Sequence, residues 1–318
     1  MRRRLETLLF LTCICFVVEV ASALAQAPAF SETRVAPVSV VDRDGKPVLG
    51  LTAANFKGEF RGQPVRIEDV TLQGGQRHIA VLLDVSISIK KNPTAWELAW
   101  AAAQDLMLTL QPPHLFSMVT VSDKAIYRTA ISAGVEQDIS AALRGLEAEA
   151  QTQGGTSSLF DAMLGVSELK LSGRPPDLLY VISDGIDNTS RNGVETVEAK
   201  LAASGVRPFF LLLPPVDEPY LARLARKRVR RIAEACGGRV IDFSRGEYNK
   251  TDPFASTRPL YDSMIRPYAI TVALPVQVDR PREWKLEVVD ERGKKLKNVE
   301  LAYPHLLVPL SGATTANE

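Results

Sequence analysis

The stretch Ile79-Ala80-Val81-Leu82-Leu83-Asp84-Val85-Ser86-Ile87-Ser88 decides the fold. Its first five residues form an uninterrupted apolar run, which is typical of a strand buried on both faces of a parallel sheet. The run ends at Asp84, and serines follow at two alternate positions. Ligands of open α/β sheets bind beyond the carboxyl ends of the strands. The stretch therefore predicts a central strand that leads into a polar loop on the binding edge of a sheet.

Further apolar runs and stretches of helical periodicity alternate along the middle of the chain. The other predicted strands are Phe116–Val121, Ala125–Ile131 as an antiparallel edge, Leu178–Ile182, Phe209–Leu213 and Arg239–Phe243. Helical spacing of apolar residues predicts helices within 93–110, 139–146, 159–169, 194–203 and 220–235. Strands separated by helices require crossover connections. We therefore expect an α/β fold: a doubly wound, mostly parallel, Rossmann-like sheet with helices on both faces.

The two flanks of this region have short β runs and turns with little helical periodicity. Val40-Val41-Asp42-Arg43-Asp44-Gly45-Lys46 in the first flank is similar to Val288-Val289-Asp290-Glu291-Arg292-Gly293-Lys294 in the second, and both are hairpin signals. One hypothesis is that the flanks pair into a smaller β domain, and the alternative is two separate extensions. The expected organisation is a signal peptide (1–25), an N-terminal β segment (26–76), the α/β domain (77–245), a linker (246–266), a C-terminal β segment (267–310) and a disordered tail (311–318).

The composition is that of a soluble globular protein. Hydrophobic residues make up 46% of the 318 residues and charged residues 24%. Lys and Arg number 38 against 37 Asp and Glu, so the net charge gives no general attraction to nucleic acid or acidic membranes. The basic cluster within 223–231 has apolar residues at helical spacing between its charges, which favours a solvated helix face over a nucleic-acid site.

The first 25 residues have the pattern of a secretory signal peptide. Three arginines open the chain, Thr7–Val20 is largely apolar, and Ala23-Leu24-Ala25 supplies small residues for cleavage. The alternative is a membrane anchor, but the apolar run is shorter than the roughly 20 residues that a span needs. No cysteine follows the small residues, which argues against a lipoprotein anchor. We expect export to a periplasm, to the cell surface or to the medium.

Cleavage would leave Cys236 as the single cysteine, so no internal disulfide is expected. Cys236 ends a helical pattern, and the three histidines, His78, His114 and His305, are scattered along the chain. This favours a buried, unreactive thiol over a nucleophile and argues against a histidine metal site.

Polar residues gather at three predicted strand ends or neighbouring loops. These residues are Asp84, Ser86 and Ser88 after the first strand, Thr156 in Gly154-Gly155-Thr156-Ser157, and Asp184 in Ser183-Asp184-Gly185. The set is all oxygen and suits a hard divalent cation, with Mg²⁺ first, Mn²⁺ or Ca²⁺ possible, and zinc disfavoured. Water would complete the coordination, and one position would be free for an outside oxygen.

Each piece also has a simpler interpretation. Serines after a strand and Asp-Gly are common in turns, and Thr156–Ser158 would serve as a helix cap, with Asp161 completing a capping box. A second alternative is a metal-dependent phosphohydrolase that uses Asp84 as its nucleophile. A haloacid-dehalogenase-type site would need a second Asp at the position of Ser86, and no histidine is near to act as a base. A third is a structural envelope protein whose site holds no metal.

The order Asp-x-Ser-x-Ser, Gly-Gly-Thr-Ser and Asp-Gly resembles the metal-ion-dependent adhesion site of von Willebrand factor A (VWA) domains, and the likeness runs from Arg77 to Phe243. Three further segments resemble exported bacterial proteins of the "VWFA-related" type known from acidobacteria: Val48–Phe56, Ser183–Asn188 and Ile232–Arg239.

The resemblance implies a role for each site residue. Ser86, Ser88 and Thr156 would be direct hydroxyl ligands, and Asp84 and Asp184 would act largely through water. Ile87 and Ile89 stand where the family usually has Gly and Met, and the β-branched Ile87 stiffens the loop. The function implied is that of a protein-binding module, not an enzyme, whose cation takes an acidic side chain from a protein partner.

Overall fold

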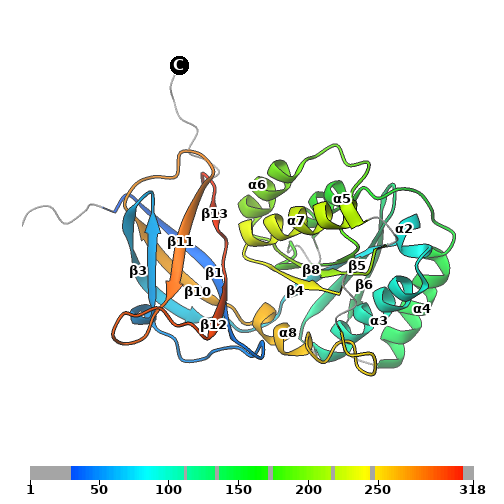
Figure 1. Ribbon diagram of the computed structural model, residues 1–318, viewed down its shortest axis with the longest axis horizontal. Helices are drawn as coiled ribbons and strands as arrows, with labels where there is room; N and C mark the ends of the chain where they lie inside the picture. Colours follow the sequence, from blue (N-terminus) through cyan, green and yellow to red (C-terminus); the bar gives the residue numbers. More distant parts are fainter. Residues whose placement is uncertain are drawn as a thin grey trace, which may run out of the picture.

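The computed structural model describes residues 30–110, 113–132, 136–170, 175–215, 219–243 and 248–310. The expected signal peptide and the expected tail from residue 311 lie outside these residues. The described chain forms two sheets, each with its own hydrophobic core, that lie side by side (Figure 1).

The larger domain has a six-stranded sheet in the order β6-β5-β4-β7-β8-β9. Its strands are β4 (His78–Asp84), β5 (Leu115–Val121), β6 (Ala125–Ser132), β7 (Leu178–Ser183), β8 (Arg207–Leu212) and β9 (Arg239–Asp242). Every neighbouring pair is parallel except β5 and β6, which pair antiparallel at the edge. The predicted fold class is confirmed, and the strand that contains Ile79–Leu83 lies inside the sheet.

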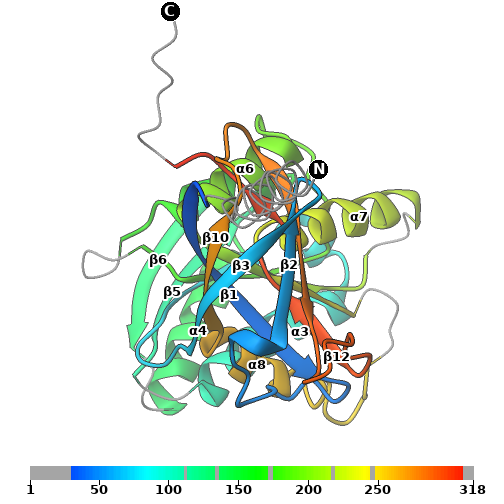
Figure 2. The same ribbon diagram turned by 90° about the vertical axis from the view of Figure 1, so that its left-hand side faces the viewer.

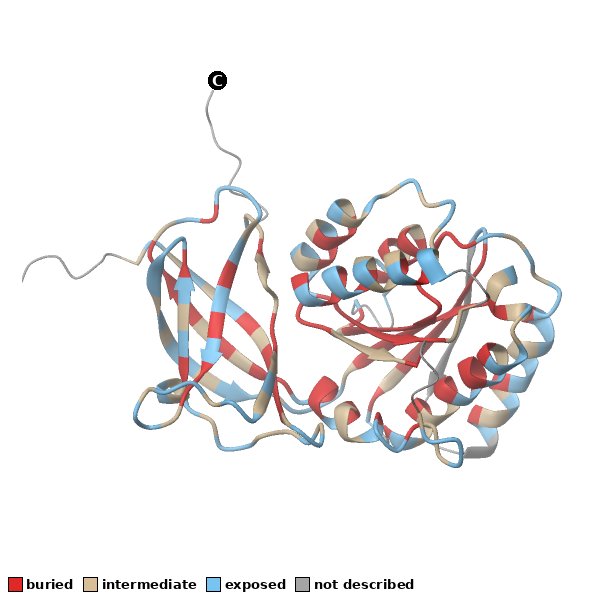
Figure 3. Ribbon diagram, viewed as in Figure 1, coloured by how far each residue is buried: buried red, intermediate tan, exposed pale blue. Residues whose placement is uncertain are grey.

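Helices cover both faces of this sheet, as Figure 1 shows. The helices are α2 (Ile87–Lys90), α3 (Pro93–Thr109), α4 (Glu136–Ala150), α5 (Leu159–Ser167), α6 (Val194–Ser204), α7 (Pro219–Ala235) and α8 (Arg258–Ile265). Ile79, Val81 and Leu83 of β4 pack in one core with α3, α4 and α8, and the alternate residues Ala80 and Leu82 pack in a second core with α5, α6 and α7. Burial on both sides explains why β4 has no polar face (Figure 3).

The smaller domain is a curled antiparallel sheet built from both flanks of the chain. Its strands are β1 (Glu32–Asp42), β2 (Phe56–Phe60), β3 (Gln63–Leu72), β10 (Tyr268–Leu274), β11 (Arg282–Val288), β12 (Val299–Ala302) and β13 (Leu306–Leu307), with a short helix η1 (Ala53–Asn55) before β2. The order is β12-β1-β10-β3-β2-β11-β13, so β10 from the second flank pairs between β1 and β3 from the first (Figure 2). The α/β domain is thus inserted between β3 and β10.

The two similar sequence segments form the same turn. Asp42 Oδ1 accepts hydrogen bonds from the backbone N–H groups of Asp44 and Lys46, and Asp290 Oδ1 accepts the equivalent pair two and four residues further on. Gly45 and Gly293 have φ angles of 79° and 74°, a conformation that favours glycine. The internal likeness therefore reflects one local structure, an Asp-anchored turn with a glycine near its end.

The segment expected as a linker contains α8, which lies where the two domains meet. The last carbonyls of α8 accept side-chain hydrogen bonds: Met264 O from Arg207 Nη2, and Ile265 O from Arg77 Nε at 3.0 Å. Ser39 of β1 donates to Ser263 O at 2.7 Å and accepts from Arg207 Nη1 at 3.3 Å. The orphan carbonyls of a helix end thus join the domains through two cations and one hydroxyl.

Candidate metal site

Asp84 is the centre of the site and is fully buried at the carboxyl end of β4. Its Oδ1 accepts the backbone N–H of Ser86 at 2.9 Å. Its Oδ2 accepts the hydroxyl of Ser183 at 2.6 Å and that of Ser157 at 3.3 Å. The carboxylate therefore holds the loops after β4 and before α5, and the end of β7, against one another.

The pKa of Asp84 is raised from its usual range to about 7. The main cause is burial, which penalises the ionised form, and the second is the nearby negative charge of Asp184. Hydrogen bonds from Ser183 and Ser86 act in the opposite direction, because they stabilise the carboxylate. Two buried carboxyl groups whose charges act on one another favour the uptake of a cation.

The serine loop after β4 is tied to the glycine loop before α5. Ser86 precedes the short helix α2, and its Oγ lies 3.1 Å from Ser88 Oγ. Between them, Ile87 N–H donates to Gly155 O at 3.0 Å, and the Ile87 side chain is 48% exposed. Gly155 has a φ of +125°, and a Cβ there would lie 3.1 Å from Asp123 Cβ. The hydrogen bond from Ile87 N–H to Gly155 O therefore fixes the position of the serine loop relative to the glycine loop.

The three predicted hydroxyl ligands line one small pocket of about 220 Å³. Ser86 is buried, Ser88 is half-buried and Thr156 is exposed. The other lining residues are Ile87, Lys91, Ser157, Ile186, Asn188 and Leu221. The structure thus brings Ser86, Ser88 and Thr156 to a common space that opens to solvent.

Asp184 lies directly after β7 and is 4% exposed. Its Oδ1 accepts the backbone N–H of Ile186 at 2.9 Å, and its charge acts on Asp84. Neither carboxylate is among the residues that line the pocket. Hydroxyl groups are therefore the donors at the pocket wall, and the two carboxylates supply negative charge behind them.

Two residues of the site were not assigned from the sequence. Ser157 and Ser183 both donate to Asp84, although they stand beside the predicted ligands Thr156 and Asp184. The only signal for them in the sequence was their position: Ser157 directly follows Thr156, and Ser183 directly precedes Asp184. Their direction depends on packing of neighbouring strands, which no local pattern encodes.

The capping box at α5, given above as the simpler alternative for this segment, is not formed. Ser158 occupies the N-cap position but makes no cap hydrogen bond, and its Oγ donates to Ser122 O and Asp123 O instead. The Asp161 carboxylate accepts the backbone N–H groups of Arg191 and Asn192. Long-range partners have replaced the local cap because the helix start is packed against the loops after β5 and β7.

The donor set fits a hard divalent cation. Carboxylate and hydroxyl oxygens with water are the ligands that Mg²⁺, Mn²⁺ and Ca²⁺ prefer. Within the part of the chain that the structure describes, no group of three or more His, Cys, Asp and Glu side chains is placed to hold a metal. Hydroxyl groups would therefore have to complete any site at Asp84 and Asp184.

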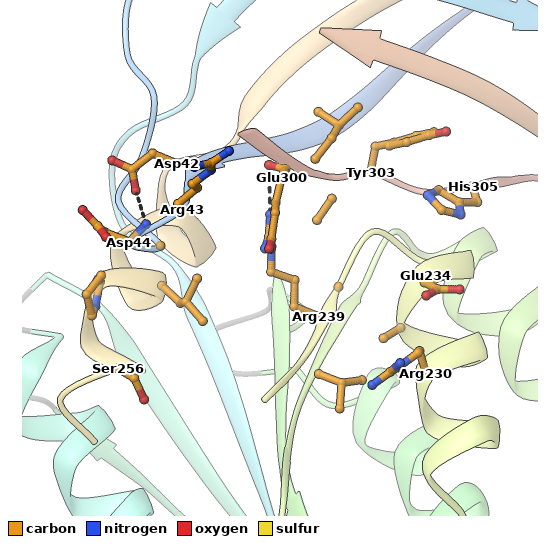
Figure 4. Close-up of a pocket in the computed structure, with 18 of the residues that line it drawn as sticks. Asp42, Arg43, Asp44, Arg230, Glu234, Arg239, Ser256, Glu300, Tyr303 and His305 are labelled. Atoms are coloured by element: carbon orange, nitrogen blue, oxygen red, sulfur yellow. Dashed lines mark hydrogen bonds and ion pairs between the residues drawn. The ribbon is translucent and has the colours of Figure 1, made fainter. Parts of the chain in front are cut away.

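A larger cavity of about 840 Å³ lies between the two domains, away from the serine loop. Figure 4 shows that both domains line it, and that Arg239 of β9 reaches Glu300 of β12, with 2.7 Å between Nη1 and Oε2. Its lining mixes both signs of charge, including Arg230 and Glu234 of α7 and Asp42 and Asp44 of the β1 turn. This mixture does not indicate one class of ligand.

Several solved structures have a similar course of the backbone. A von Willebrand factor type A protein from Catenulispora acidiphila is 12% identical, covers 90% of this chain and 77% of its own, and has a TM-score of 0.47. An aerotolerance-related membrane protein from Bacteroides fragilis is 16% identical, covering 59% of this chain and 98% of its own, with a TM-score of 0.46. Proximal thread matrix protein 1 from the mussel byssus, with a zinc-occupied MIDAS motif, is 15% identical and covers 63% of this chain and 49% of its own, with a TM-score of 0.43.

No family model matches this sequence, and neither does any curated protein. At these identities the structural likeness concerns the fold alone. The α/β domain is similar in fold to VWA-type proteins, the class that the sequence resemblance predicted.

Proposed function

We propose that this chain is a protein-binding module of the VWA type that recognises a partner through a divalent cation held at Ser86, Ser88 and Thr156. The observation that carries the proposal is the convergence of these three hydroxyls on one pocket next to the buried Asp84. The raised pKa of Asp84 supports it, because a cation would relieve the charge that Asp84 and Asp184 place on each other.

Each residue has a distinct task in this proposal. Ser86, Ser88 and Thr156 offer their hydroxyl oxygens at the pocket wall, while Asp84 orients the serine loop through Ser86 N–H. Asp184 adds the second negative charge, and Ser157 and Ser183 fix the Asp84 carboxylate. When bound, Mg²⁺, or in its place Mn²⁺ or Ca²⁺, supplies an open position that an acidic side chain of a protein partner fills.

The proposal includes export of the protein and no enzymatic activity. Among the residues that the structure describes, no helix is both long enough and apolar enough to cross a membrane. The signal-peptide pattern of residues 1–25 is the observation that supports export. The test is the N-terminal sequence of the protein recovered from the host, which is expected to begin at Gln26.

Direct titration with Mg²⁺, Mn²⁺ and Ca²⁺ by calorimetry tests the cation site. Asp84→Ala and the double variant Ser86→Ala/Ser88→Ala are expected to lose binding. Asp279→Ala, which removes an exposed carboxylate in the smaller domain, is the matched control and is expected to bind as the wild type does. Unchanged binding in both site variants would contradict the proposal.

Partner capture tests the second half of the proposal. The immobilised chain is exposed to the host's envelope fraction in Mg²⁺ and in EDTA, with Asp84→Ala beside the wild type. A partner retained only by the wild type and only in Mg²⁺ is expected. Capture that is indifferent to both EDTA and Asp84→Ala would exclude recognition through the cation.

A further inference from the structure

A groove of about 500 Å³ lies beside the metal-site pocket and is lined in part by α7. Pocket and groove share Asn188 in the loop after β7. On α7, Leu221 lines the pocket and Leu224, one helical turn later, lines the groove. The groove then passes Lys227 and Arg228 and reaches Arg231. A ligand seated in the pocket therefore has the groove next to it on the same side of α7.

The groove carries an excess of positive charge that the protein itself does not neutralise. Six charged residues line it: Arg191, Lys227, Arg228, Arg231, Asp187 and Glu195. The Asp187 carboxylate accepts backbone N–H groups of Phe160 and Ser190, and Glu195 pairs with Arg231 at 2.9 Å. Both anions of the groove are thus engaged within the protein.

Two cations of the groove, Lys227 and Arg228, are left for a ligand, because the charge of Arg191 already acts on Asp161. Throughout the described ranges of the chain, Arg191, Lys227 and Arg228 take part in no salt bridge. Lys227 is exposed and Arg228 is half-buried in the groove wall. Elsewhere in the basic cluster, Arg226 pairs with Asp242. The cluster predicted as a solvated helix face is therefore divided: Arg226 and Arg231 form ion pairs, Lys227 and Arg228 line this groove, and Arg223 and Arg230 are exposed outside it.

We propose that the groove binds further acidic side chains of the same partner segment whose carboxylate enters the metal site. The partner would then present an acidic stretch rather than an isolated Asp or Glu. This inference rests on the proposed function of the pocket. The ten helical steps from Leu221 to Arg231 span about 15 Å, which an extended segment of about five residues covers.

The groove fits a peptide better than a nucleic acid. Asp187 and Glu195 lie among its cations, so a strand with a phosphate at every step would meet negative charge as well as positive. A peptide places carboxylates at intervals and neutral residues between them. An acidic peptide therefore matches the spacing of Lys227 and Arg228 without contact with the two anions.

Two synthetic peptides and two double variants test the proposal. The probes are acetyl-Gly-Ser-Asp-Gly-Glu-Gly-Glu-amide and the same peptide with both Glu replaced by Gln, titrated by calorimetry in Mg²⁺ at low salt. We expect the Glu peptide to bind wild type about five- to tenfold more tightly, as two exposed ion pairs allow. Lys227→Gln/Arg228→Gln is expected to abolish this difference and leave Mg²⁺ binding itself unchanged.

Arg223→Gln/Arg230→Gln is the matched control, because it removes the same charge from the same helix at residues that do not line the groove. The control is expected to keep the preference for the Glu peptide. If both double variants lose the preference for the Glu peptide equally, the preference depends only on the overall charge of the helix, and the proposal is overturned. Tighter binding of oligothymidine than of the Glu peptide, lost in Lys227→Gln/Arg228→Gln, would also overturn it.

The outcome separates the groove from the metal site. If wild type binds both peptides equally and only in Mg²⁺, the groove proposal is wrong and the metal-dependent pocket stands. If neither peptide binds in a Mg²⁺-dependent way, the proposed function fails together with this inference.

Discussion

Ser183 Oγ donates a 2.6 Å hydrogen bond to Asp84 Oδ2, across 99 positions of sequence. The bond joins the carboxyl ends of β4 and β7, which are parallel neighbours in the sheet. Asp84 also accepts Ser157 Oγ and Ser86 N–H, so three separate segments meet on one buried carboxylate. Both the shape of the serine loop and the response of the site to pH therefore depend on Asp84.

The first prediction concerns the stability of the cation-free protein. Burial first, and the charge of Asp184 second, raise the pKa of Asp84 to about 7 in the folded state. A carboxyl group with a raised folded pKa contributes stability below its unfolded pKa near 4 and loses that stability as the pH rises through about 7. At about 1.4 kcal/mol per pKa unit, the loss is on the order of 4 kcal/mol.

Urea unfolding in EDTA at pH 5 and pH 8 measures the larger part of this loss, about 2–3 kcal/mol, because stability already falls between pH 4 and pH 5. We expect the free energy of unfolding of wild type to be lower at pH 8, and Mg²⁺ to restore it there because the ionised site binds the cation. Asp84→Asn keeps an acceptor for Ser183 without the charge, so its decline from pH 5 to pH 8 is expected to be smaller. An equal decline in both proteins would assign the pH dependence to other groups.

The second prediction compares two adjacent glycines before α5. Gly155 has a φ of +125° and no room for a Cβ beside Asp123, whereas nothing lies within 4 Å of a Cβ at Gly154. Gly155→Ala is expected to lower the free energy of unfolding by about 1–3 kcal/mol. It should also weaken Mg²⁺ binding, because Gly155 O accepts Ile87 N–H. Gly154→Ala should change neither quantity appreciably, and equal effects in calorimetry and urea unfolding would contradict the strain at Gly155.

The α/β fold was predictable because uninterrupted apolar runs mark the strands that are buried on both faces of the sheet. The run Ile79–Leu83 packs on both faces, and Asn92 caps α3 by accepting Ala95 N–H, with Pro93 as the first helical residue. The helix α8 was missed. It has eight residues, of which Tyr261 and Met264 lie in the core with α3, and so short a segment offers too few turns for its apolar spacing to be recognised as a helix.

The site was predictable only in part, because the local sequence indicates which loops meet but not how their side chains pack. The strand-end rule brings loops together, and it predicted that Ser86, Ser88 and Thr156 would be near one another. It does not say where a hydroxyl points. Ser157 is buried and donates to Asp84, whereas its neighbour Thr156 is exposed at the pocket, a difference that arises from packing and not from residue type.

The third prediction concerns the thiol of Cys236. The side chain is 3% exposed at the end of α7, and burial, followed by the charge of Glu198, raises its pKa to about 12. The thiolate is the reactive form, so native protein without residues 1–25, in which Cys236 is the single cysteine, is expected to react with Ellman's reagent only as fast as it unfolds. Protein in urea should react at once and provides the control. Rapid labelling of the folded chain would mean that the thiol is accessible and ionised.

The last prediction concerns the joint between the domains. Ser39 of β1 is 2% exposed, and its hydroxyl donates to Ser263 O while it accepts from Arg207 Nη1. Ser39→Ala leaves a buried carbonyl and a buried guanidinium each short of one partner, which is expected to cost about 1–3 kcal/mol of unfolding free energy in urea. Ser204→Ala removes an exposed hydroxyl with local partners alone, since it donates to Leu201 O and accepts Val206 N–H at 3.5 Å, and its effect should stay within about 0.5 kcal/mol. A loss in Ser39→Ala no greater than in Ser204→Ala would show that this network does not hold the domains together.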